Sequence, residues 1–294
     1  MLNTNVDRLV KISVLGAIAH PASGQSPYNI STDGEPVVVT GPSGITYNIR
    51  VGDSATRWIA DHVEPAVSIR HPEGEGMAGA NDGLNVLACV GNQALVVSGK
   101  AEGKTGTVTG KHGGAERIMV DFTPDIMEQM VLGDKIMIRA WGVGLALEDY
   151  PDVKLFNTSP DLLAAWNIEE HGGVLQVPVA RKVPAAIMGS GLGRDNVYRG
   201  DYDITTFDEE MVSEYGLDQL RLGDFVAIMD ADHRYGRIYR EGAVSIGIVI
   251  HGDSYIAGHG PGVTSLMTSR SGKINPVLDA RANLACVMGL REDI

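Results

Sequence analysis

Residues 224–252 read DFVAIMDADHRYGRIYREGAVSIGIVIHG and carry the pattern that decides the fold. Two apolar runs, in residues 225–229 and 243–250, flank a polar segment that contains glycine. Short Val- and Ile-rich runs bounded by Gly and Asp are typical of buried strands joined by turns. We therefore expect this stretch to form strands rather than helices.

The same pattern recurs along the chain. Apolar runs separated by some of the 37 glycines occur, for example, at KISVLGAIA (11–19), ALVVSG (94–99) and DKIMIRAWG (134–142). GKTGTVTGKHGGAERIMVDF (103–122) has the form of a hairpin, with a glycine-rich turn between two strands. The pattern predicts a β-rich α+β protein, in which short strands and Gly-rich turns form sheets or barrel-like units covered by a few helices.

Helix signals are few. Ser159 and Pro160 suit the start of one helix, and Thr206 followed by the acids 208–210 suits another. TPDIMEQM (123–130) and NPVLDARANLACVMGL (275–290) have a similar character. The stretches around two Leu-Gly-Asp turns, at 132–134 and 222–224, resemble each other, and this internal similarity favours two domains. We expect a β-rich domain in residues 1–150 and an α+β domain in residues 151–294.

The net charge of -13 excludes some partner classes. Such a charge repels phosphate backbones and anionic membranes, so neither nucleic acid nor a membrane is an expected partner. Cys89 and Cys286 lie in apolar contexts, which is typical of thiols in a reducing compartment. The run 12–19 is short for a signal-peptide core and Asp7 lies in its would-be basic region, so a cytoplasmic location is expected.

Familiar cofactor motifs do not fit. GKAEGKT (99–105) is one residue short of a phosphate loop and no helix pattern follows it, and a G-x-G-x-x-G fingerprint is absent, so no nucleotide cofactor is expected. Residues 230–241 place acids at the first, third and twelfth positions of a calcium loop. Arg234 at the fifth position and glycine at the seventh exclude that reading.

Histidines near acids are the strongest chemical signal. Most lie in predicted loops or at strand ends, where sites often form. The candidate metal ligands are His20, Asp61, His62, His112, Asp232 and His233, and the candidate catalytic carboxylates are Glu64 and Asp230. Such nitrogen and oxygen donors suit Zn, Mn or Fe.

Two expectations concern where these residues lie. In ADHVEPAVSIRHPEGEG (60–76) we expect His62 to be buried and His71 to be exposed. We also expect Asp230, Asp232 and His233 to share one pocket with His62.

Several long stretches indicate a family. HPASGQSPYNISTDGEP (20–36), GMAGANDGLNVLACVGN (76–92) and LRLGDFVAIMDADHRYGR (220–237) are among those by which the chain resembles, over nearly its full length, a bacterial and archaeal family classed as a domain of unknown function. A weaker resemblance links GDFVAIMDADHRYGRIYREGAVSIG (223–247) to acetamidase and formamidase enzymes. The Asp-to-His spacing departs from that of those enzymes, which puts a shared mechanism in doubt.

Three function classes follow from these observations. The leading hypothesis is metal-assisted hydrolysis of a small amide-like substrate. The alternative is a non-catalytic protein that binds a small ligand or a metal in the same pocket, and the third is a structural or assembly protein. In each case a homo-oligomer is expected. Convergence of the named side chains on one point with an open position would favour the enzyme.

Overall fold

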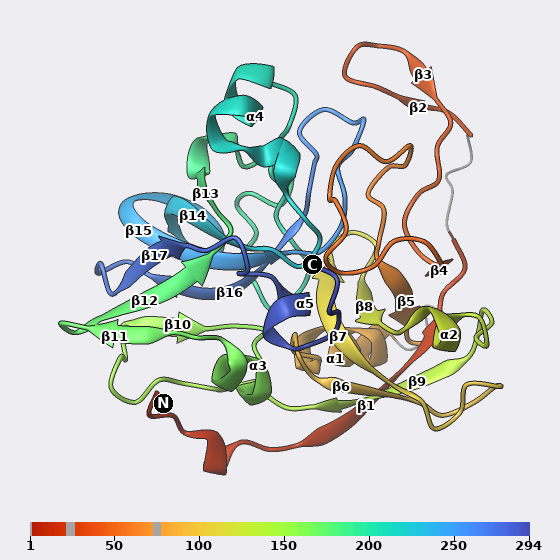
Figure 1. Cartoon of the computed structure of the whole chain (residues 1–294), viewed down its shortest axis with the longest axis horizontal. Helices are drawn as coiled ribbons and strands as arrows, with labels where there is room; N and C mark the ends of the chain where they lie inside the picture. The colour runs from red at the N-terminus through yellow and green to blue at the C-terminus, as the bar shows by residue number, and fades with distance from the viewer. Residues whose placement is uncertain (1, 22–26, 73–77) are drawn as a thin grey trace.

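The computed structural model describes residues 2–21, 27–72 and 78–294 (Figure 1). Its strands are β1 (Ile12–Ile18), β2 (Asn29–Ile30), β3 (Pro36–Val37), β4 (Ile45–Thr46), β5 (Ala66–Arg70), β6 (Gln93–Val96), β7 (Thr105–His112), β8 (Arg117–Asp121), β9 (Lys135–Ala140), β10 (Val153–Leu155), β11 (Glu169–His171), β12 (Val174–Val179), β13 (Arg181–Pro184), β14 (Phe225–Asp232), β15 (Ile238–Val249), β16 (Val263–Ser269) and β17 (Ile274–Leu278). Its helices are α1 (Ala78–Leu87), α2 (Pro124–Met127), α3 (Pro160–Ala165), α4 (Glu209–Tyr215) and α5 (Leu284–Val287), with 3-10 turns at Val6–Arg8, Ala185–Ile187 and Leu217–Gln219. This composition confirms the predicted β-rich α+β class.

The first large sheet closes into a barrel-like unit. Its strand order is β1-β9-β6-β7-β8-β5-β4, and β1 also pairs with β5, so that six of the strands form a ring. Apolar side chains between Ile18 and Ala140 fill the interior of this ring. The hairpin predicted at 103–122 is β7 paired antiparallel with β8.

The second large sheet has the order β10-β16-β15-β14-β13, and a smaller sheet, β11-β12-β17, lies beside it (Figure 1). Buried residues of both sheets pack with α3 into one apolar cluster. The division of the chain into residues 1–150 and 151–294 stays a prediction. Within the described part of the chain, no helix is long and apolar enough to cross a membrane.

Most of the predicted helix starts are observed. The Ser159 hydroxyl accepts a hydrogen bond from the backbone N–H of Leu162 and caps α3, and α2 begins within 123–130. The cap of α4 is Asp208, rather than Thr206, because its carboxylate accepts from two backbone N–H groups of the first turn.

The stretch 275–290 differs from the prediction. Its first part belongs to β17, which pairs parallel with β12, and only Leu284–Val287 form a helix. Pro276 is tolerated because β17 is the last strand of its sheet. The sequence signals do not predict helix α1, whose two glycines disfavour a helix.

The two large sheets meet where β7 lies against β16 and the end of β15. The backbone N–H of Lys111 donates to the hydroxyl of Thr264 (3.2 Å), and that hydroxyl donates to the carbonyl oxygen of Lys111 (3.2 Å). A side chain at Gly110 would place its Cβ 2.2 Å from Cγ2 of the buried Ile250. The missing side chain therefore lets β7 approach the residue that precedes His251.

Because of this close approach, we expect a methyl group added at Gly110 to destabilise the fold. Gly110→Ala would force Ile250 and its neighbours to move, so we expect a loss of about 1–3 kcal/mol in the free energy of unfolding. Gly83→Ala is the matched control, because Gly83 lies in α1 with no atom near the position of a Cβ. We expect that control to stabilise by about 0.5–1 kcal/mol. Urea denaturation measures both, and an equal effect of the two substitutions would contradict the proposed packing.

Candidate metal centre

Four histidine rings come together where the two large sheets meet. The ring centroids of His112, at the end of β7, and His251, just after β15, lie 4.3 Å apart. The ring of His62, which precedes β5, lies 5.0 Å from those of His251 and His259. His259 belongs to the loop between β15 and β16. Segments far apart in the sequence thus contribute to one cluster.

Three of these rings are held by their Nδ1 atoms. Nδ1 of His112 lies 2.5 Å from a carboxylate oxygen of Glu64, and Nδ1 of His62 lies 3.2 Å from Asp61. His251 Nδ1 lies 2.8 Å from the carbonyl oxygen of Gly252. In metal sites a carboxylate or carbonyl commonly holds one ring nitrogen so that the other faces the ion. Nε2 is the nitrogen left for the cluster in each case.

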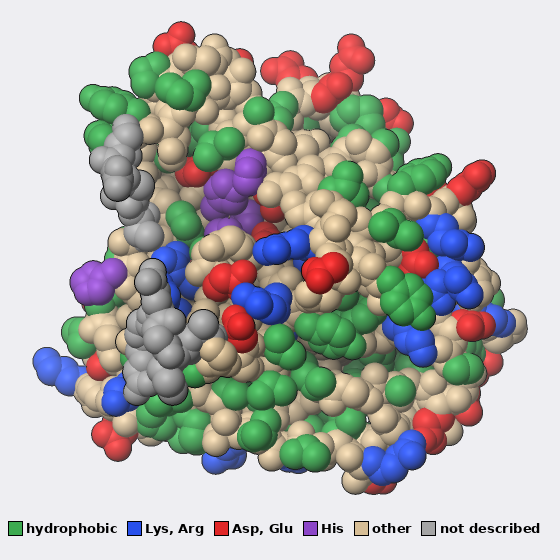
Figure 2. Space-filling view, turned by 180° about the vertical axis from the view of Figure 1, so that it is seen from behind, with side chains coloured by type: hydrophobic (Ala, Val, Ile, Leu, Met, Phe, Trp, Pro, Cys, Tyr) green, Lys and Arg blue, Asp and Glu red, His purple; other side chains and the backbone are tan. Residues whose placement is uncertain are grey.

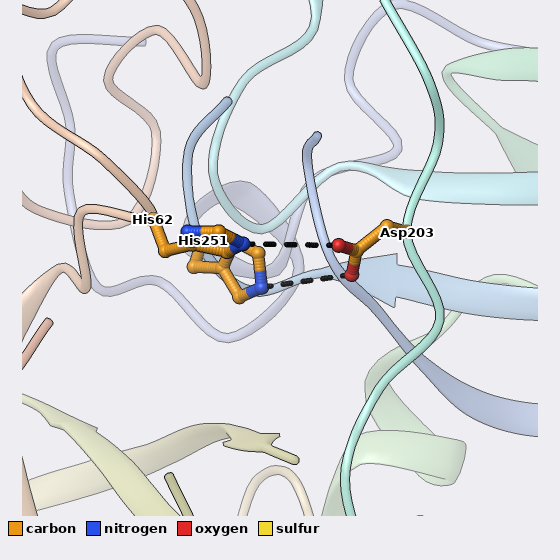
Figure 3. Close-up of side chains that lie close together, drawn as sticks. All are labelled: His62, Asp203 and His251. Carbon is orange, nitrogen blue, oxygen red and sulfur yellow. Dashed lines mark ion pairs between the residues drawn. The ribbon is translucent and has the colours of Figure 1, made fainter. Parts of the chain in front are cut away.

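Two carboxylates enter the cluster from the segment that precedes α4. An Asp201 oxygen lies 2.7 Å from Nε2 of His251. Asp203 places one oxygen 3.1 Å from Nδ1 of His259 and 3.8 Å from Nε2 of His62, while its other oxygen is 3.9 Å from Nε2 of His251. Figure 3 shows the Asp203 carboxylate facing His62 and His251.

The charges of the cluster are mutually dependent. Burial by itself would lower the pKa of His62, but its contacts with Asp203 and Asp61 outweigh burial and raise that pKa to about 10. Burial likewise opposes ionisation of Asp203, yet hydrogen bonds to His259 and His62 hold its pKa below the ordinary value. The pKa of Asp201 is also lowered, against its burial, chiefly by the charge of His251. Both carboxylates are therefore ionised at neutral pH.

The backbone approaches the cluster closely at two glycines. The N–H of Gly113 donates to the Asp201 carboxylate at 2.7 Å. A Cβ at Gly262 would lie 2.1 Å from an oxygen of Asp201 and 2.3 Å from Nε2 of His251. Gly262 thus leaves space at the point where the ligand atoms converge.

A small cavity opens from the cluster to the surface. Its volume is about 220 Å³, and its lining includes His62, His112 and His259 together with Asp203, Ser190 and Arg194. Figure 2 shows a group of histidine side chains at the bottom of a hollow on this face of the molecule. A ligand can therefore reach the cluster from solvent.

The arrangement has the composition and spacing of a metal site. His62, Asp203 and His251 offer ligand atoms within 4.8 Å of one another, and so do His112, Asp201 and His251. Imidazole nitrogen with carboxylate oxygen suits Zn, Mn or Fe. A compact His and Asp cluster beside an open cavity can hold an ion and leave a coordination position for another molecule.

Four of the sequence-predicted residues lie here. His62 and His112 belong to the cluster, and His62 is buried, as predicted. Asp61 and Glu64 lie behind these rings rather than at the cavity. Glu64, the candidate catalytic carboxylate, is fully buried and also accepts a hydrogen bond from Ser68, so its position suits orienting His112. His71 is partly buried rather than exposed, and residues 73–77 lie outside the described part.

The other four predicted residues lie elsewhere and do not line the cavity. His20 is exposed on the segment after β1. Asp230 occupies a bulge of β14 with φ of 58° and accepts from the backbone N–H of Gly242. Asp232 pairs with Arg234 at 2.9 Å, and Nδ1 of the buried His233 lies 2.8 Å from the Ser265 hydroxyl.

The structure therefore does not join Asp230, Asp232 and His233 with His62 in one pocket. Tyr202 is the physical reason. Its ring stands 5.5 Å from that of His233, whereas its chain neighbours Asp201 and Asp203 contact the cluster. Since adjacent side chains in an extended segment point to opposite sides, His233 lies on the far side of this segment.

The sequence pattern does not indicate His251, His259, Asp201 or Asp203 as candidate ligands. The sequence nevertheless holds a signal for two of them. Asp201 and Asp203 are separated by one residue in GDYDI (200–204), and this spacing places both on one face of an extended chain. His251 follows the apolar run that forms β15. No local pattern connects these segments to His62 or His112.

Comparison with known proteins gives family matches and one close structural relative. The family model described as domain of unknown function (DUF4438), N-terminal, matches residues 28–164, and its C-terminal counterpart matches residues 165–288. The crystal structure of TM1086 is similar over 97% of this chain and 98% of its own, with 47% sequence identity and a TM-score of 0.91. No match was found among the curated proteins. The acetamidase resemblance stays a prediction.

Because His233 lies outside the cluster, we expect its protonation to affect the stability of the fold and not the cluster. Burial, followed by the charge of Arg237, lowers the pKa of His233 from 6.5 to about 3. Between these values the unfolded chain binds a proton that the folded chain does not, so stability is lost as the pH falls through this range. As the pH is lowered, we expect the free energy of unfolding of the wild type to fall faster than that of His233→Asn. The difference between the two slopes should reach up to about 1.4 kcal/mol per pH unit. Urea denaturation between these pH values tests this, and parallel curves would contradict it.

Proposed function

The chain belongs to the DUF4438 family, and we propose that it is a metal-dependent hydrolase that acts on a small amide-like substrate. One observation carries the proposal. Asp61, Glu64 and the Gly252 carbonyl hold the Nδ1 atoms of three histidines, which leaves Nε2 of each ring for one of two overlapping groups of candidate ligands. Such outer contacts fix the tautomer and the ring direction that a metal requires.

The chemistry follows from the donors and the cavity. A divalent ion in this cluster would supply a Lewis acid, which lowers the pKa of a bound water and polarises a carbonyl group. Asp201 and Asp203 are ionised and adjacent to the ligand nitrogens, so a carboxylate oxygen that does not bind the ion is placed to accept a proton. Glu64 and Asp61 act by holding the rings.

The cavity supports a small substrate. Its volume of about 220 Å³ is below the roughly 300–1,000 Å³ of pockets that bind drug-sized ligands. Ser190 and Arg194 lie in its lining and offer hydrogen-bond donors to a carbonyl or carboxylate. The cytoplasmic location and the homo-oligomer stay predictions.

The ligands themselves provide the first test. His62→Ala removes a ligand, so we expect the affinity for the ion that His62 binds and the hydrolysis of small amides each to fall at least tenfold. His171→Ala is the control, because His171 is exposed on β11 and lies beside Glu169. Metal content by elemental analysis and amide hydrolysis should be unchanged in that variant. Wild-type protein that binds Zn, Mn and Fe no better than the His62→Ala variant would contradict the proposal.

Glu64 provides a second test that separates positioning from packing. Glu64→Gln keeps the shape of the side chain but removes the charge that holds His112, and we expect metal affinity to weaken about 10–100-fold. Titration of chelator-treated protein with Zn measures the affinity, and circular dichroism checks that the variant is folded. Metal bound with wild-type affinity by the folded variant would remove Glu64 from the centre. Bound metal without hydrolysis of any small amide would favour the non-catalytic alternative.

A further inference from the structure

His251 cannot serve every ligand set in which it takes part. Its Nδ1 is engaged by the Gly252 carbonyl, so Nε2 is its one free nitrogen, and a nitrogen lone pair binds one ion. Yet both compact sets, His62 with Asp203 and His112 with Asp201, include His251. The cluster therefore contains more donors than one ion placed at His251 explains.

His62 and His112 also fail to share an ion. Their rings are nearly parallel with centroids 5.8 Å apart, and no compact set of the described residues contains both. With metal–nitrogen bonds of about 2.1 Å, two ligands of one ion lie at most about 4.2 Å apart. One ion would leave one of these two oriented histidines without a metal.

A complete outer set exists without His251. Nε2 of His62 lies 3.1 Å from Nδ1 of His259, and one oxygen of Asp203 lies 3.1 Å from His259 and 3.8 Å from His62. The two separations of 3.1 Å match the roughly 3.0–3.4 Å between neighbouring ligands about 2.1 Å from a tetrahedral or octahedral ion, and the separation of 3.8 Å is wider than this but within the limit of about 4.2 Å. The side chain of His259 is 36% exposed, so this set lies at the cavity mouth.

The remaining donors form an inner set. An Asp201 oxygen lies 2.7 Å from Nε2 of His251, and His112 completes a group whose ligand atoms lie within 4.8 Å of one another. All three residues are buried. The second oxygen of Asp203 lies 3.9 Å from Nε2 of His251 and so faces this inner set.

We propose that the centre holds two divalent ions bridged by Asp203, an outer one on His62 and His259 and an inner one on His112 and His251 with Asp201. This rests on the proposed metal-dependent function. Asp61, Glu64, Asp201 and Asp203 together carry four negative charges, which match the charge of two divalent ions. Two-metal hydrolytic sites commonly place their ions about 3.5–4 Å apart, a span that a bridging carboxylate covers.

Metal stoichiometry tests the proposal. The full-length chain is stripped with chelator, reloaded with excess Zn or Mn, desalted and measured by elemental analysis. We expect two ions per chain in the wild type and in His171→Ala, and one in either His259→Ala or His112→Ala. Asp203→Ala should lower the affinity for both ions. Circular dichroism identifies any variant that is not folded.

The outcomes separate this inference from the proposed function. One ion per wild-type chain would overturn the two-ion centre and leave the metal-dependent function standing, whereas no ion would overturn both. A second readout uses only wild-type protein loaded with Mn. Two bridged ions should give the electron paramagnetic resonance spectrum of a coupled pair, and the spectrum of isolated Mn at full loading would contradict the proposal.

Discussion

The close approach of β7 to the end of β15 is the constraint on which the candidate centre depends. Gly110 lets the strand lie against Ile250, and the Lys111 backbone is bound to Thr264 of the second sheet. His112 and His251 each follow these contacts by one residue. The packing of the two sheets therefore sets the distance of 4.3 Å between the centroids of these two rings.

The end of β7 is polar on both of its faces, which fixes how it sits between the sheets. Lys111 is fully buried, and its ammonium donates to Asn157 and to the carbonyl oxygens of Val86 and Tyr198. The next residue, His112, points to the cluster of histidines and aspartates. A shift by one residue would exchange these side chains and leave a buried charge without its partners, at a cost of several kcal/mol.

Much of the fold was predictable because its signals are local. Glycine-bounded apolar runs predicted the strands, and Ser159 with Pro160 predicted α3. Local signals also drew attention to His62 and His112, whose partners Asp61 and Glu64 lie in the same short stretch as His62. The rest of the cluster depends on contacts between residues separated by up to 197 positions, such as His62 and His259. The cluster around His233 was misleading because Tyr202 separates it from the centre, which only packing reveals.

The histidines and aspartates at this junction are proposed to hold divalent metal. Anomalous diffraction from crystals grown with Zn, recorded on both sides of the zinc absorption edge, tests it most directly. We expect anomalous density between Nε2 of His251 and the carboxylates of Asp201 and Asp203, about 2.0–2.2 Å from its ligands. An ordered cluster with no anomalous density at this position, in crystals grown with excess Zn at neutral pH, would show that these residues do not hold the metal.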